Sequence, residues 1–121
     1  MSDTITAEVR QGASTVEQLR TRAMQSAARG QFDEACTMLE SALAHDEAPK
    51  LEVLGDLAAI ALRAGDLVHA ISISRHVLAS DERHDAARYT LATGLAAIGS
   101  DLEALEHFEQ LDNDRFREQM P

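Results

Sequence analysis

The chain has 121 residues, enough for one compact domain but not comfortably for two. Hydrophobic residues make up 45% and aromatic residues only 3%, and 21 alanines and 14 leucines far outnumber the 10 valines and isoleucines. This composition provides a core and favours closely packed helices over sheets. With 11 basic and 21 acidic residues the net charge is −10, which disfavours binding to nucleic acid or to a membrane surface.

The sequence also indicates where the protein resides. Its longest uninterrupted hydrophobic run, residues 57–62, is far too short for a membrane span, and the first residues lack the basic-then-apolar pattern of a signal peptide. The single cysteine, Cys36, cannot form an internal disulfide. Arg outnumbers Lys ten to one, a usage common where codons are GC-rich. We therefore expect a cytoplasmic, bacterial protein.

Residues 1–13 are polar and lack a regular hydrophobic period, so we expect a mobile N-terminal tail there. From residue 14 onward apolar residues recur at three- and four-residue spacing, the period of amphipathic helices. We predict six helices, at about 15–29, 32–45, 49–63, 67–79, 84–98 and 101–111. The remaining segment, 113–121, is predicted to be a short C-terminal capping stub.

The predicted helices form three similar units. Three glycines are 35 and then 34 residues apart, and each stands seven residues after one alanine and five before another. The glycines are Gly30, Gly65 and Gly99, and their alanines are Ala23, Ala58 and Ala92 before them and Ala35, Ala70 and Ala104 after them. Glycine ends a first helix, and a second helix begins two or three residues later. Residues 14–112 therefore divide into three repeats at about 16–49, 50–84 and 85–112.

At this point the chain resembles the tetratricopeptide repeat (TPR) family over about residues 16–112. The period and the Gly-x-(Phe/Leu)-x-x-Ala pattern of the first two copies carry the resemblance. In the third copy Asp101 replaces the expected aromatic residue or Leu, and Arg88 replaces a bulky aromatic residue. The resemblance implies an all-α, right-handed superhelical stack of three helix-turn-helix repeats. It also implies a concave groove, lined by the first helices, that holds peptides or helices of partner proteins.

Helical phase assigns the side chains that would line this groove, on the face of each first helix turned away from its second helix. The candidate partner-binding residues are Arg20, Thr21, Met24, Asp56, Ala59, Arg63, Tyr89, Thr90 and Thr93. Tyr89 offers a rigid contact surface and Met24 an adaptable one, although both could instead pack within the stack. TPR proteins that grip the C-terminal carboxylate of heat-shock chaperones use a clamp of Lys, Asn and Arg. At the corresponding positions only Arg20 is basic and Asp56 has the wrong sign, so we do not expect that ligand class.

The outer apolar side of the last helix pair needs a cover. Phe116 and Met120 are spaced i, i+4 and could form a short helix over Leu105 and Phe108. If this stub is insufficient, the same four residues are candidates for self-association, giving a homo-oligomer through the C-terminal end.

The sequence contains no arrangement of residues that indicates catalysis. Cys36 has no basic neighbour in sequence to activate its thiol, and the five histidines form no i, i+4 pair. The repeat glycines lie at helix turns and Gly94 lies inside a predicted helix, so the sequence has no glycine-rich phosphate-binding loop. We therefore expect no catalytic residues, no metal and no cofactor.

The most direct interpretation is a non-enzymatic protein–protein interaction module that acts as a scaffold, an adaptor or a small chaperone, for example one that shields a secretion substrate. Two alternatives remain at this point. The chain could be a self-assembling structural protein, or the TPR regulatory domain of a larger bacterial enzyme.

Overall fold

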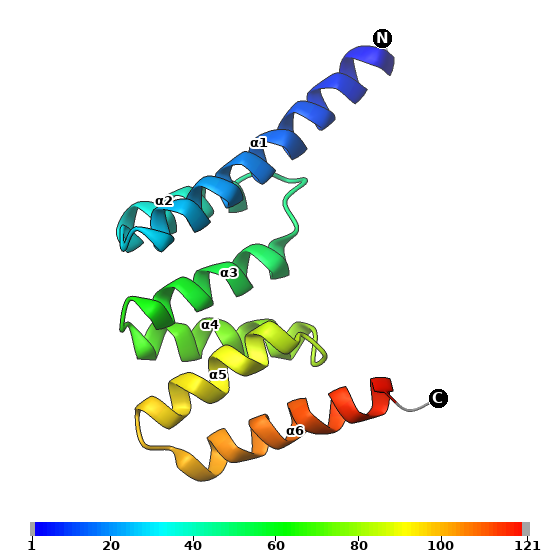
Figure 1. Ribbon diagram of the computed structural model, residues 1–121. Coiled ribbons are helices and arrows are strands. Elements are labelled where there is room, and N and C mark those ends of the chain that lie inside the picture. Colours follow the sequence, from blue (N-terminus) through cyan, green and yellow to red (C-terminus); the bar gives the residue numbers. More distant parts are fainter. Residues whose placement is uncertain (1, 120–121) are drawn as a thin grey trace.

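The computed structural model describes residues 2–119, with the side chains of residues 15–115 and 117–119. Six helices account for nearly all of these residues, and the described range contains no strand. The helices are α1 (Ser2–Ala28), α2 (Phe32–Leu43), α3 (Lys50–Arg63), α4 (Leu67–Ser80), α5 (Asp85–Ala97) and α6 (Asp101–Gln119). They pack as the pairs α1–α2, α3–α4 and α5–α6, which stack in chain order (Figure 1).

The turn inside each repeat has the same geometry. The glycines that follow α1, α3 and α5 have positive φ angles, 79° at Gly30, 84° at Gly65 and 89° at Gly99. In each turn the N–H after the glycine donates to a carbonyl five residues back, for example Gln31 N to Ser26 O at 2.9 Å. Glycine adopts this left-handed conformation without the steric cost that a Cβ would add, so the repeated glycine ends each first helix.

Small residues lie where the two helices of each repeat meet. The six alanines of the repeat pattern (Ala23, Ala35, Ala58, Ala70, Ala92 and Ala104) are all buried, none with more than 2% of its surface exposed. Gly94 acts similarly between repeats, because a Cβ there would lie 3.0 Å from Ile71 Cγ1. These residues allow helix backbones to approach closely, as the sequence predicted, and a larger side chain would overpack the contact.

The first two repeats share a large core. Leu39 of α2 and the α3 residues Val53, Leu57 and Ile60 are buried in one cluster, to which α1 contributes Val16. A smaller second cluster joins α4, α5 and α6. The solenoid therefore has two apolar clusters, and the N-terminal one contains more large side chains.

The two end helices differ from the sequence prediction. Helix α1 begins at Ser2 rather than at residue 15, because the preceding segment contains no proline and Gly12 alone does not stop the helix. Helix α6 continues to Gln119, so residues 113–119 extend the same helix instead of folding back as a stub over Leu105 and Phe108. Met120 and the side chain of Phe116 lie outside the described residues.

Candidate functional site

The candidate site is the face formed by the exposed side chains of the first helices α1, α3 and α5, here called the first-helix face. Its N-terminal part contains an open pocket of about 390 Å³. The pocket is lined by Glu17, Arg20, Thr21, Met24 and Asp56. Four of these five residues belong to the set predicted from helical phase, and the structure brings them together across two repeats. Glu17 was missed, although it precedes Thr21 by one helical turn.

An ion pair crosses this pocket. Arg20 Nε of α1 donates to Asp56 Oδ2 of α3 at 2.9 Å, with 31% and 22% of the two side chains exposed. Arg20 and Asp56, which are 36 residues apart in the sequence, therefore neutralise each other's charge. Their ion pair also links the first repeat to the second. Met24 beside them is 44% exposed and provides the apolar surface of the pocket.

Arg63, at the end of α3, contacts two residues of the first repeat. Its Nη2 donates to the carbonyl oxygen of Ala27 at 3.4 Å, and its guanidinium lies 5.9 Å from the centroid of the Phe32 ring. A cation at the carbonyl end of α1 is favourable, and the aromatic face adds to this attraction. Arg63 thus joins two repeats and offers little free charge to a ligand.

The C-terminal part of the first-helix face differs from its prediction at one residue. Tyr89 is 57% exposed, but its ring also makes an edge-to-face contact with Phe108 of α6, with centroids 6.2 Å apart. Thr93 and Ala59 are half-buried. Thr90 is only 4% exposed, so its assignment to the groove lining was wrong. Helices α3 and α4 both pack against α5 and leave a narrower exposed sector than helical phase alone suggests.

His84 lies beneath the centre of this face and was missed by the sequence analysis. Its Nδ1 accepts a hydrogen bond from Ala87 N at 3.1 Å, which caps the start of α5. Its ring occupies the space beside Gly55, where a Cβ would lie 3.0 Å from His84 Cε1. A larger residue would require the ring to shift, and Gly55 is buried rather than open to a ligand.

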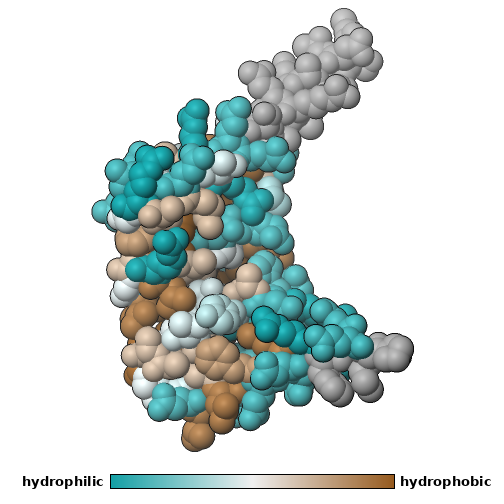
Figure 2. Space-filling view, in the orientation of Figure 1, coloured by the Kyte–Doolittle hydropathy of each residue, from teal (hydrophilic) through white to brown (hydrophobic). Residues whose placement is uncertain are grey.

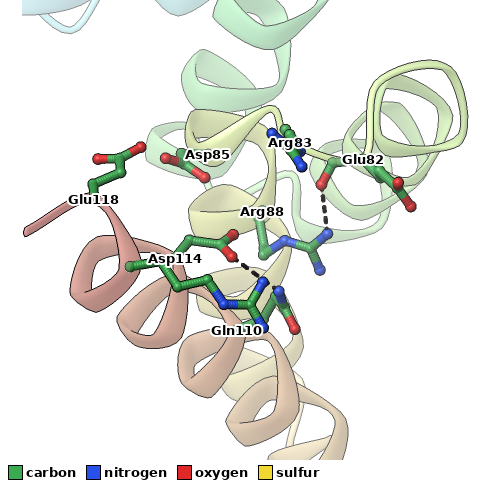
Figure 3. Close-up of a pocket in the computed structure, with 8 residues that line it drawn as sticks. Glu82, Arg83, Asp85, Arg88, Gln110, Asp114 and Glu118 are labelled. Atoms are coloured by element: carbon green, nitrogen blue, oxygen red, sulfur yellow. Dashed lines mark hydrogen bonds between the residues drawn. The ribbon is translucent and has the colours of Figure 1, made fainter. Parts of the chain in front are cut away.

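A second concavity lies at the other end of the molecule, between the start of α5 and the C-terminal half of α6 (Figure 3). It has a volume of about 430 Å³ and a mixed-charge lining of Glu82, Arg83, Asp85, Arg88, Gln110, Asp114, Arg117 and Glu118. Arg88 donates to Glu82 O at 2.7 Å and to His107 Nδ1 at 2.9 Å. This guanidinium therefore ties the α4–α5 turn to α6, and we assign it a structural role.

Of the residues predicted for self-association, Leu105, Phe108 and Phe116 belong to α6. Leu105 is 52% exposed, and Phe108 is half-buried against the second core cluster. Leu102, which the sequence analysis did not select, is 82% exposed. Figure 2 shows hydrophobic residues gathered over the α5–α6 turn, whereas the surface over α1 and α2 is largely hydrophilic.

The described residues provide little for catalytic chemistry. Burial raises the pKa of the Cys36 thiol, and the carboxylates of Glu40, Asp33 and Asp66 raise it further, which disfavours the reactive thiolate. No group of three or more His, Cys, Asp or Glu side chains within the described range could hold a metal ion. Of the helices in that range, none is long and apolar enough to cross a membrane.

Comparisons with known proteins define the fold. No family model matches the sequence, and no curated protein matches it. Among solved structures, the second TPR domain of Spaghetti (RPAP3), bound to the HSP90 peptide SRMEEVD, is similar, with a TM-score of 0.73. It is 17% identical in sequence, and the match covers 92% of this chain and 96% of that one.

A Podospora anserina protein described as a kinesin light chain with nearly identical TPR-like repeats is also similar, with a TM-score of 0.67. It is 25% identical, and the match covers 88% of this chain and 57% of that one. The chain therefore has the TPR fold, an all-α solenoid of helix-turn-helix repeats, as the sequence resemblance predicted.

Proposed function

We propose that the chain is a non-enzymatic protein-interaction module that binds a peptide or helix of a partner protein on its first-helix face. The TPR fold supports this role, since the structurally similar Spaghetti domain is bound to a peptide. Binding a client in this way would suit a scaffold, an adaptor or a small chaperone in the cytoplasm.

The observation that carries the proposal is the pocket between α1 and α3. Its exposed Met24 lies beside Thr21 and beside an ion pair whose charges already cancel. Such a surface is complementary to an apolar side chain, because a flexible thioether adapts its shape while polar groups at the edge orient the ligand.

The same geometry disfavours an acidic C-terminal peptide as the partner. Arg20 already accepts Asp56 as its counter-ion, and a ligand carboxylate would have to displace that side chain. Arg63 is likewise engaged with Ala27 O and Phe32. We therefore propose a partner segment with an apolar anchor rather than a terminal carboxylate.

A pull-down from a bacterial lysate tests the proposal, with mass spectrometry to identify a stoichiometric partner and calorimetry to measure its affinity. Met24→Glu and Ala59→Arg should each weaken binding at least about tenfold, because they place a charge or bulk on the first-helix face. Val68→Glu is the matched control, since Val68 is 78% exposed on α4, a second helix.

Circular dichroism should show unchanged helical content and melting temperature for all three variants. A partner that binds the wild type and every variant equally would overturn the assignment of the face. Met24 is a better test residue than Tyr89, because Tyr89 also supports Phe108 and its replacement would alter α6.

A further inference from the structure

The outward side of α6 is a second apolar surface, distinct from the first-helix face. In the two preceding repeats the corresponding side of the second helix is covered by the next first helix, α3 on α2 and α5 on α4. Phe108 occupies the repeat position of Leu39 and Ser74, both 0% exposed, but it is only half-buried. Leu105 stands at the position of Ile71, which is 9% exposed, but is itself 52% exposed. Leu102, at the position of the exposed Val68, lies at the edge of this surface and is 82% exposed.

Carboxylates are interspersed among these apolar residues. Asp101, Glu109 and Asp112 are exposed and lie on the same side of α6 by helical phase. None of the three forms an ion pair with another described side chain, whereas Glu103 on a different side pairs with Arg75 at 2.8 Å. We call this surface, made of Leu102, Leu105, Phe108 and the three carboxylates, the α6 outer face.

The repeat register shows what these carboxylates replace. Asp101 stands at the position of Phe32 in α2 and Leu67 in α4, and Asp112 stands at the position of Leu43 and Leu78. A helix that covers α2 or α4 meets apolar groups at these positions. A helix that covers α6 must instead bring cations there and apolar groups opposite the leucines and Phe108.

We propose that the α6 outer face is a docking site for a basic amphipathic helix of a partner protein. Such a helix carries an apolar stripe at i, i+3 and i+4 spacing with Lys or Arg on both flanks. Its stripe would cover Leu105 and Phe108, whose ring is already held by the edge contact with Tyr89. Cations at the two ends of the stripe would pair with Asp101 and Asp112, and a cation on its flank would pair with Glu109.

A second copy of this chain fits the face less well. Its own α6 would bring the same three carboxylates, on a chain whose net charge is already −10. The outward side of its α1, at the repeat positions that α3 and α5 use to cover the preceding helix, carries Gln18, Arg22, Gln25 and Arg29. Those residues match the charge but provide no apolar side chain for Leu105.

The test uses a fluorescein-labelled synthetic peptide of about 18 residues, long enough to form a helix, with a Leu and Ala stripe flanked by Lys. Fluorescence anisotropy measures its binding to the full chain. A control peptide has the same composition in scrambled order, without a stripe. We expect the amphipathic peptide to bind at least about tenfold more tightly than the scrambled one.

Variants of the protein locate the site. Leu105→Gln should weaken peptide binding about tenfold or more, whereas Val68→Gln, which also replaces an exposed apolar residue, should change it less than about twofold. Glu109→Gln with Asp112→Asn should weaken binding and reduce its salt dependence. Asp33→Asn with Glu34→Gln on α2 changes the net charge equally and should have little effect.

Three results would overturn the proposal. One is equal binding of both peptides, and another is equal loss of affinity in the control variants, because either would mean general attraction to an acidic protein. The third is a wild-type protein that sediments as a dimer, does not bind the peptide, and becomes a monomer on Leu105→Gln. A second copy of the chain would then cover the α6 outer face. Met24→Glu should leave peptide binding unchanged, so the proposal on the first-helix face can fail independently.

Discussion

We call the packing interface between two neighbouring repeats a joint. The first joint, between repeats one and two, and the second, between repeats two and three, have the same helix arrangement but contain side chains of different size. At the first joint Leu39 of α2 faces the core and Ile60 of α3 is fully buried. At the second joint Ser74 and Gly94 occupy the corresponding repeat positions. Large side chains fill the first joint, whereas the second is closed by small residues that let Ile71 approach Gly94.

Polar links supplement the second joint and the third repeat. Arg75 of α4 donates to Glu103 of α6 at 2.8 Å, and Arg88 donates to His107 at 2.9 Å. Arg88 stands where the first two repeats have Leu19 and Leu54. A solenoid is stabilised by its repeats and by the joints between neighbours, so we expect the C-terminal third to open at lower free energy.

The largest expected change in stability distinguishes the two joints by substitutions at equivalent positions. Leu39→Ala should lower the free energy of unfolding by about 2–5 kcal/mol, because it leaves a cavity in the larger core. Ser74→Ala, at the equivalent position, should cause no loss and should stabilise the protein by up to about 1 kcal/mol, because the buried Ser74 Oγ has no hydrogen-bond partner among the described residues. Urea denaturation measures both.

Equal destabilisation by the two variants would contradict this difference between the joints. Hydrogen exchange on the wild type provides an independent check, because α5 and α6 should exchange before α2 and α3.

The repeated turn offers a case in which the repeats should behave alike. Replacing Gly30, Gly65 or Gly99 by Ala should each cost about 1–2 kcal/mol, because all three have a positive φ that a Cβ penalises. Apart from the adjacent residues, no described atom lies within 4 Å of the added Cβ at any of the three, so the cost comes from backbone strain rather than from a clash with another element. Thermal denaturation of the three variants should give similar shifts, and a much larger cost at one glycine would show that the turns are not equivalent.

The sequence predicted the interior of the fold because each repeat encodes its own signals. Glycine and alanine recur at fixed distances, and α3, expected at 49–63, is observed at Lys50–Arg63. The outer ends of α1 and α6 were predicted less well because the glycine and alanine pattern does not extend beyond the first and last repeats. Helix α6 passes the expected end at residue 111 without interruption.

The candidate site was predicted in part for a related reason. Helical phase selects the side of one helix, and in the structure the predicted Arg20 and Asp56 side chains are 31% and 22% exposed on α1 and α3. It does not give the distance between helices, and it therefore missed that the two side chains form an ion pair. It also missed the burial of Thr90, which depends on two helices packing against α5.

A smaller effect should appear on acidification. Burial lowers the pKa of His107, and the neighbouring Arg88 lowers it further, below the ordinary value of 6.5. Between these two pKa values the unfolded chain binds more protons than the folded chain, so stability is full above pH 6.5 and falls as the pH decreases below it. We expect a loss of less than about 1 kcal/mol, because solvent screens the half-exposed ring.

Urea denaturation at pH 7.5 and at lower pH, for wild type and His107→Gln, measures this dependence. In His107→Gln the free energy of unfolding should depend less on pH, because Gln does not titrate. Its side-chain oxygen can still accept a hydrogen bond from Arg88. An identical pH dependence in both proteins would show that the Arg88–His107 link does not respond to protonation.

The smallest effect concerns the Arg20–Asp56 ion pair at the first joint. A double-mutant cycle with Arg20→Gln and Asp56→Asn should give a coupling of about 0.5 kcal/mol, because the side chains are partly exposed and solvent screens their attraction. High salt should reduce this value further. A coupling as large as the loss from Leu39→Ala would contradict this difference between the joints, since the first would then depend as much on an ion pair as on its large apolar side chains. A small coupling means instead that the large apolar side chains around Leu39, and not this ion pair, account for most of the stability of the first joint.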